Sequence, residues 1–369
     1  MIRLISEKPI SKKSAKRIRY AILLAYRGQN YFGMQLQKEY PTVEGCLLKA
    51  LLENNFISKE EYKDPFLCYF QRASRTDRSV SAVRQVCTIK MPKNNNFITN
   101  GSDILNMKLP LDIRIFGIRR TTPSFHPQKS CFARTYSYTL PTFAFAKSNE
   151  LTSAAFRITD ETINEISSVL QIFVGTHNFF NYTSKKQYDE KSCCRFIHSF
   201  KCGPKRLFRD EIRNEDVEFI TIFIKGQSFM LHQIRKMIGM VIAVCRGFAY
   251  KSDIQKSFEN ARLDLPKAPG LGLVLERLHY DYYDKKFANL HGSLSYWGDT
   301  IENAVEDMRE CIISDILKKE VTTYNMLSWI SSLINHDFSE NDDSAIPPLA
   351  IAGGIALGKI TVVQNSMKR

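Results

Sequence analysis

Residues 72–82 read Arg72-Ala73-Ser74-Arg75-Thr76-Asp77-Arg78-Ser79-Val80-Ser81-Ala82 and place one carboxylate among several arginines. The stretch follows an apolar run at 66–70 and precedes a strand-like run at 85–89, so we expect Asp77 in a polar connection between two strands. An ionised Asp among cations is a candidate nucleophile facing an anionic substrate. A surface turn with an ordinary ion pair is the alternative interpretation of this stretch alone.

The charge balance of the chain indicates a polyanionic partner. At 369 residues the chain is long enough for two or three domains, and its net charge is +14. Such an excess of positive charge is typical of nucleic-acid-binding proteins, with a membrane surface as the competing partner. The longest apolar run, 237–245, is too short to cross a bilayer, so we expect no membrane partner.

The cysteines and glycines give no sign of a metal or a cofactor. None of the nine cysteines forms a CxxC pair, which fits reduced thiols in the cytosol, the nucleus or the mitochondrial matrix. Cys194, His198 and Cys202 are spaced by four, but no second ligand pair follows them. No GxGxxG motif is present either, so we predict no metal and no cofactor.

The spacing of apolar residues predicts alternating strands and helices. Strands are expected at 18–26, 66–70, 85–89, 113–118, 132–140, 217–225 and 271–280. Helices are expected at 43–56, after Ser102, at 160–173, 228–245, 300–319 and 324–334, with loops at 94–96 and 182–192. Gly247 is the expected C-terminal cap of the helix at 228–245.

The helix predicted at 228–245 has two different faces. One is an apolar stripe, and the other is a row of His232, Arg235 and Lys236 that continues to Gly239. We expect this row to face a phosphate backbone, with Gly239 permitting close approach. A solvated helix face is the alternative.

Six motifs, in this order, resemble those of the TruA family of tRNA pseudouridine synthases. They are Tyr26–Gln35, the Arg-Thr-Asp motif at 75–77, Ala133-Arg134-Thr135-Tyr136-Ser137-Tyr138, Gly175-Thr176-His177-Asn178-Phe179, Gly226–Gly239, and the run 264–281. Each motif is weak alone, but together they cover about residues 19–281 and are specific. Met34, where the family commonly has Trp, resembles the eukaryotic nuclear and mitochondrial branch.

The resemblance implies roles for individual side chains. Asp77 falls on the family's nucleophile, and Arg235 falls on the cleft arginine that pairs with it. Tyr136 falls on the tyrosine that stacks on the target base, an interaction worth roughly 1–3 kcal/mol. It is also a candidate for removing the C5 proton. Arg75 falls on the arginine that helps to extrude the uridine.

Four further residues are expected to contact RNA: Arg134, His177, His232 and Lys236. A hydrogen-bonded structural role is the alternative for each histidine. The chain also departs from the family at Ser74 and Ser79, where the family commonly has Gly, and at 126–129, where an Arg-containing pattern is common. Gly permits backbone conformations that Ser disfavours, so the Asp77 loop is expected to differ in shape.

The resemblance further implies an α+β fold. It has two similar α/β halves with mixed, mainly antiparallel sheets facing a central basic cleft, plus a C-terminal helical extension. The expected parts are a basic arm at 1–17, a half with the Asp77 loop at 18–146, a half with the long helix at 147–283, and the extension at 284–369. We expect the extension to be a structural appendage on the second half.

The implied function is isomerisation of uridine to pseudouridine in tRNA, in and near the anticodon stem. Messenger RNA and small nuclear RNA are further candidate substrates. The alternative is a noncatalytic RNA-binding or tRNA-chaperone protein on the same scaffold, which the presence of Asp77, Tyr136 and Arg235 argues against. We expect a monomer rather than a homodimer, located in the nucleus, with the mitochondrion as the alternative.

Overall fold

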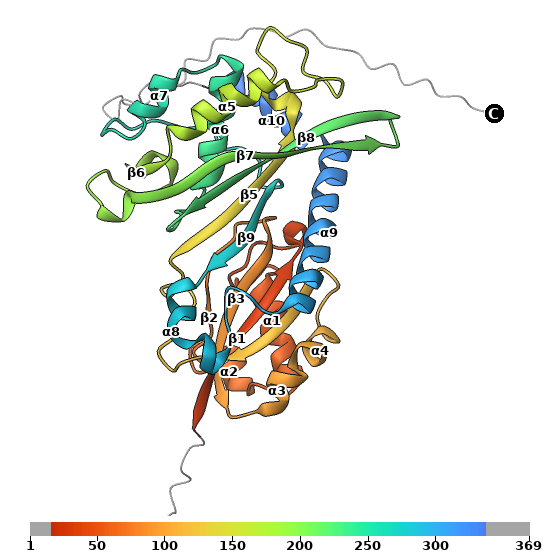
Figure 1. Cartoon of the computed structure of the whole chain (residues 1–369), viewed down its shortest axis with the longest axis vertical. Helices are drawn as coiled ribbons and strands as arrows, with labels where there is room; N and C mark the ends of the chain where they lie inside the picture. The colour runs from red at the N-terminus through yellow and green to blue at the C-terminus, as the bar shows by residue number, and fades with distance from the viewer. Residues whose placement is uncertain (1–15, 337–369) are drawn as a thin grey trace, which may run out of the picture.

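The computed structural model describes residues 16–336, so nearly all of the predicted basic arm and the end of the predicted C-terminal extension lie outside the described residues. The fold is α+β, as predicted, with helices packed on a large mixed sheet and helices at the C-terminal end (Figure 1).

The strands predicted from apolar runs are present with shifts in their ends, except the one expected at 66–70. The strands of residues 16–336 are β1 (Arg17–Tyr26), β2 (Gln71–Arg72), β3 (Ser81–Pro92), β4 (Ile113–Arg120), β5 (Ala133–Pro141), β6 (Gly175–Asn178), β7 (Cys194–Asp210), β8 (Glu215–Gly226) and β9 (Leu273–His279).

Helices connect these strands and follow them. The α-helices of the same residues are α1 (Val43–Glu53), α2 (Lys59–Lys63), α3 (Asn95–Thr99), α4 (Gly101–Asn106), α5 (Asp160–Gln171), α6 (Gln233–Arg246), α7 (Lys251–Lys256), α8 (Asp281–His291), α9 (Asp299–Thr323) and α10 (Asn325–Leu333).

One sheet contains all the described strands, in the order β4-β1-β3-β9-β5-β8-β7-β6, with β2 paired to β3. Every pairing is antiparallel except that of β3 with β9, which is parallel and involves only Ser81↔Val274 and Ala82↔Leu275. This short junction lies directly after the Asp77 loop and joins β1, β3 and β4 to β5, β8 and β7 (Figure 1). Although β5 precedes residue 146 in the chain, it pairs with β8 along its length.

Strand β1 shows why this sheet needs cover on both faces. Every residue from Arg19 to Tyr26 is buried, so side chains pointing to either face lie out of water. A continuous apolar strand of this kind is stable only between two packed layers. Helix α9 packs against β1, β3 and β4, and α3 and α4 pack against β4.

The packing of α9 corrects the expected position of the C-terminal extension. The extension was predicted to sit on the second half, but α9 contacts β1, β3 and β4 as well as β7. Ion pairs fix it there: Arg84 with Glu302, and Arg309 with Glu276 at 3.0 Å. Within residues 16–336 no helix is long and apolar enough to span a membrane.

Three sequence expectations were wrong. The apolar run 66–70 forms a turn instead of a strand, and Phe66 is 85% exposed. The long helix begins at Gln233 instead of Ser228. The strand β7 was not predicted, because its apolar residues are sparse and it lies open to solvent along much of its length. A smaller error is α3, which starts inside the expected loop because the Asn94 side chain caps it by accepting from the Phe97 amide.

Candidate active site

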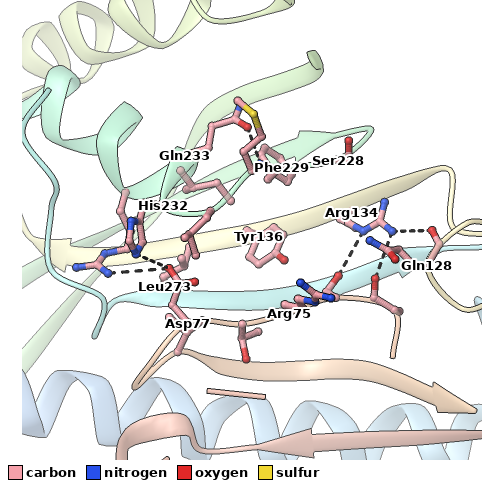
Figure 2. Close-up of a pocket in the computed structure, with 18 of the residues that line it drawn as sticks. Arg75, Asp77, Gln128, Arg134, Tyr136, Ser228, Phe229, His232, Gln233 and Leu273 are labelled. Carbon is pink, nitrogen blue, oxygen red and sulfur yellow. Dashed lines mark hydrogen bonds and ion pairs between the residues drawn. The ribbon is translucent and has the colours of Figure 1, made fainter. Parts of the chain in front are cut away.

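A pocket of about 760 Å³ lies at the junction of β3, β9 and β5. Four separate segments line it: the Asp77 loop, residues 128–136, residues 227–235 and the start of β9 at Leu273 (Figure 2). Segments that are distant in sequence therefore converge on one cavity next to the single parallel pairing of the sheet.

The Asp77 loop packs closely against the segment that follows β1. A Cβ on Gly33, whose φ is +101°, would lie 2.7 Å from the Thr76 carbonyl oxygen, and one on Gly28 would lie 2.1 Å from that of Val80. Only glycine permits this approach of two backbones. The Tyr26 hydroxyl also hydrogen-bonds to Thr76 Oγ1 at 2.8 Å. These contacts explain why the motif after β1 accompanies the Asp77 loop.

The Asp77 carboxylate faces two basic side chains from the other side of the pocket. Its Oδ2 lies 4.0 Å from Arg235 Nη1 and 3.9 Å from His232 Nε2 (Figure 2). The expectation that Asp77 and Arg235 meet within salt-bridge reach is confirmed. Arg235 is held in place because its Nε donates to the Ala268 carbonyl oxygen at 2.8 Å.

His232 ends the loop before α6 in a left-handed conformation, with φ of 65°. Such a conformation is strained for a residue with a side chain, and strain of this kind is often found at functional sites. Burial lowers the pKa of His232, although the nearby Asp77 opposes this effect. The imidazole is therefore largely neutral near pH 7, and Arg235 provides the permanent positive charge beside Asp77.

Tyr136 forms the apolar wall of the pocket. Its ring packs edge-on against Phe229, with 5.4 Å between the ring centroids, and it is 7% exposed. Burial raises the pKa of Tyr136, and Ser74 partly opposes this shift. The phenol is therefore protonated near pH 7, so removal of a C5 proton would require a phenolate that this environment disfavours. Stacking on a base needs no such ionisation.

Arg134 was expected to contact RNA, but its guanidinium is buried and occupied. It donates to the carbonyl oxygens of Gln227 at 2.7 Å and Gln128 at 2.8 Å, and to Ser74 Oγ at 3.3 Å. These bonds connect three of the segments that line the pocket, so Arg134 stabilises their arrangement. Ser74 is accommodated because Gln85 bonds both its amide and its carbonyl, so this departure leaves the loop ordered.

Of the other residues predicted to contact RNA, one lines the pocket and two lie outside it. Arg75 is exposed and lines the pocket. Lys236 lies outside it, with Nζ donating to the Asn181 carbonyl oxygen at 3.0 Å. His177 is also outside, bonded to the Val174 carbonyl oxygen and stacked on Phe258. For His177 this geometry fits the structural alternative.

Gly239 does not face a phosphate-binding surface. A Cβ there would lie 2.1 Å from the Pro266 carbonyl oxygen, so this glycine permits close packing of the loop before β9. The predicted basic row is therefore not one exposed helix face. Arg235 points to Asp77, whereas Lys236 bonds to a neighbouring loop.

Sequence reasoning missed several residues of the pocket because it placed residues 228–232 inside a helix. Ser228 and Phe229 line the pocket from an irregular segment that follows β8 (Figure 2). Gln227, just before them, lines it as well. Gly226 at the end of β8 was the available signal for such a segment. Among the residues that the structure describes, no group of three or more His, Cys, Asp or Glu side chains is arranged to hold a metal ion.

Comparison with known proteins shows the family to which the chain belongs. Residues 169–281 match the family model described as tRNA pseudouridine synthase. The chain is 38% identical over 324 residues to the human protein called pseudouridylate synthase 1 homolog, covering 86% of this chain and 73% of the human one. The mouse protein of the same name is 37% identical over 339 residues, covering 90% and 77%.

A fungal relative gives the same result. The Yarrowia lipolytica protein called tRNA pseudouridine synthase 1 is 31% identical over 368 residues, covering 76% of this chain and 68% of the fungal one. The chain therefore belongs to the tRNA pseudouridine synthase family. It is an RNA-modifying isomerase that converts uridine to pseudouridine in tRNA, and the noncatalytic alternative is not favoured.

Proposed function

We propose that the pocket around Asp77 receives the target uridine of tRNA after the base has left its stack. The observation that carries the proposal is the convergence of Asp77, Arg235 and Tyr136 on one cavity from three segments of the chain. Asp77 acts as the nucleophile, Tyr136 stacks on the base, and the exposed Arg75 fills the space that the base vacates.

The reaction is an isomerisation and needs no external reactant. The bond between ribose C1′ and N1 breaks, the uracil turns, and C1′ bonds to C5. C5 loses a proton and N1 gains one, so product and substrate have the same composition. Asp77 attacks either the ribose or the base in this scheme. Arg235 and His232 orient its carboxylate, and the apolar wall of Tyr136 and the partly buried Phe229 limits access of water.

The wider organisation follows from the same proposal. The strand groups β1-β3-β4 and β5-β7-β8 form two similar halves that meet at β9, and tRNA lies in a basic cleft between them. The positive net charge of +14 supports binding to a polyanion. The preferred uridines lie in and near the anticodon stem, with messenger RNA and small nuclear RNA as further substrates. The protein acts as a monomer in the nucleus, with the mitochondrion as the alternative.

Substitutions of Tyr136 test the proposed role of the pocket. The assay measures tritium release from tRNA labelled at C5 of uridine. Tyr136→Phe keeps the stacking surface and should retain activity within about tenfold of the wild type. Tyr136→Ala should lose roughly 100-fold, in line with the worth of one stacked base. Equal activities of the two variants would show that stacking on Tyr136 is not used.

A further inference from the structure

We propose that a second pocket beside Arg75 binds the base of the nucleotide next to the target uridine. This inference rests on the proposed function, because it requires the uridine to occupy the Asp77 pocket. The second pocket has a volume of about 380 Å³, which lies within the range of sites that bind small molecules.

The two pockets are contiguous. They share Ala73, Ser74 and Arg75 of the Asp77 loop and Gln128 of the segment before β5, so these residues line both cavities. In Figure 2, Arg75 is drawn between Asp77 and Gln128. A strand whose target base enters one cavity therefore brings an adjacent nucleotide to the mouth of the other.

The lining of the second pocket suits a nucleobase. Leu36, Pro65, Phe66 and Phe70 supply apolar surface, and Gln35, Gln71, His126 and Gln128 supply polar groups. Apolar walls for the ring and amide or imidazole groups for its edge are what proteins use to read unstacked bases.

One carboxylate also lines this pocket, but it is neutralised. Glu44 is 2% exposed and pairs with Arg72, whose Nε lies 2.8 Å from Glu44 Oε2. The wall therefore presents an ion pair instead of an isolated negative charge, and the remaining charged lining residue, Arg75, attracts the phosphate backbone.

The turn at 65–70 gives independent support. Phe66 is 85% exposed, Leu67 52% and Tyr69 53%, in a segment apolar enough to predict a strand. Exposed apolar side chains that lie together mark an interaction site. Because Phe66 lines a cavity continuous with the tRNA site, an unstacked base is the occupant that fits it.

His126 adds a donor of fixed orientation. Its Nδ1 accepts from the backbone amides of Gln128 at 3.2 Å and Lys129 at 3.4 Å, so the proton of the neutral ring lies on Nε2. Burial, followed by the nearby Lys129 and Arg19, lowers the pKa of His126 and keeps it neutral near pH 7.

The test is a double-mutant cycle that combines a substitution in the protein with an abasic residue in the RNA. The target uridine is first mapped, and tRNAs are then made with an abasic residue at its 5′ or its 3′ neighbour. Tritium release gives kcat/KM for the wild type, Phe66→Ala and His126→Ala. For one neighbour, loss of the base should lower wild-type kcat/KM about tenfold. Phe66→Ala should lower kcat/KM by a similar factor on intact tRNA. When Phe66→Ala acts on the abasic tRNA, the loss in kcat/KM should be clearly smaller than the product of the two separate losses.

The proposal would be overturned if the losses in kcat/KM from the substitution and from the abasic residue multiply at both neighbours. It would also be overturned if neither abasic residue changes kcat/KM. Met107→Ala is the matched control, since it also removes an exposed apolar side chain but lies outside both pockets. The same cycle is measured by binding of the Asp77→Asn variant to these RNAs, and coupling is expected there as well. An active wild type without coupling defeats this inference alone, whereas absence of tritium release on every tRNA defeats the proposed function.

Discussion

The carboxylate of Asp77 lies 4.0 Å from the guanidinium of Arg235, with the two side chains only 18% and 16% exposed. Asp77 is fixed by the loop that packs on Gly28 and Gly33, and Arg235 by its bond to the Ala268 carbonyl oxygen. The two groups are therefore held close together by contacts that each segment makes with a different neighbouring segment. An arrangement fixed in advance avoids the cost of ordering these groups during the reaction.

Asp77→Asn should remove catalysis and spare tRNA binding. The substitution keeps the size of the side chain but removes its charge and its nucleophilicity. The rate of tritium release should fall by about 10⁴-fold or more, which corresponds to roughly 5.4 kcal/mol of barrier. Binding measured on filters should be unchanged or tighter, because phosphate contacts dominate affinity and a negative charge has been removed.

Asp103→Asn is the control for this experiment. Asp103 lies exposed in α4 and lines neither pocket, so this variant should retain wild-type release and binding. Release by Asp77→Asn at near the wild-type rate would show that Asp77 is not the nucleophile. Loss of binding together with release would indicate that the Asp77 loop has collapsed.

The central strands could be predicted from sequence because apolar runs encode them directly. Both faces of β1 are buried from Tyr20 to Tyr26, and this part of its sequence is correspondingly apolar. In contrast, β7 carries Lys, Arg and Ser along an exposed face, so neither a continuous run nor clean alternation marks it. At 66–70 the error was the reverse, since a strand was predicted where the structure has a turn. The apolar side chains of this run lie on an exposed surface, and their composition resembles that of a strand.

The candidate site was predictable by residue type but not by conformation. Resemblance indicated Asp77, Tyr136 and Arg235 together, and all three line the pocket. The left-handed backbone of His232 and the burial of Arg134 depend on contacts with distant segments, which spacing along one helix or strand does not contain. Tertiary contacts therefore decided which basic residues face the cavity.

Ser79→Gly should stabilise the protein. Ser79 has φ of 65°, a left-handed conformation that costs a non-glycine residue about 1 kcal/mol, and its amide donates to the Tyr31 carbonyl oxygen at 3.1 Å. Glycine relieves this strain, so urea unfolding should show a gain of up to about 1 kcal/mol, reduced by the greater freedom of glycine in the unfolded chain.

Ser102→Gly is the opposite case, since Ser102 lies in the first turn of α4 and is not one of the residues with positive φ. It should lose roughly 0.5–1 kcal/mol of unfolding free energy. If Ser79→Gly destabilises the protein by a similar amount, the Asp77 loop does not hold the left-handed conformation in solution.

The salt dependence of tRNA binding should distinguish Lys236 from Lys267. The sequence predicts that Lys236→Ala flattens the slope of log affinity against log salt by about one unit. In the structure, however, Lys236 is partly buried and bonded to the Asn181 carbonyl oxygen, whereas Lys267 is exposed on the same side. We expect Lys267→Ala to flatten the slope by about 0.9 and Lys236→Ala by clearly less.

Filter binding of tRNA between about 50 and 200 mM salt gives both slopes. A wild-type slope near zero would contradict the electrostatic basis of binding altogether. A full unit of change for Lys236→Ala, with none for Lys267→Ala, would mean that Lys236 leaves Asn181 to reach a phosphate when RNA binds.

Glu320 links the stability of the C-terminal helices to pH. Its carboxyl is 7% exposed near the end of α9, and its Oε1 accepts from the Met326 amide at 2.6 Å. Burial raises the pKa of Glu320 from 4.5 to about 7. The folded protein therefore binds this proton more tightly than the unfolded chain does. The resulting stability is fully present below about pH 4.5 and is lost as the pH rises through 7.

Glu320→Gln should remove this loss, because the amide oxygen still accepts from Met326 and carries no charge. At pH 8.5 the variant should be more stable than the wild type by up to about 3 kcal/mol, because the carboxyl of the wild type must ionise with a pKa of about 7 instead of 4.5. At pH 4.5 the two proteins should differ little. Urea unfolding at both pH values measures the difference, and Glu306→Gln, on the exposed side of α9, is the control. A Gln variant no more stable than the wild type at pH 8.5 would mean that the ionised Glu320 reaches solvent by releasing Met326 and the start of α10.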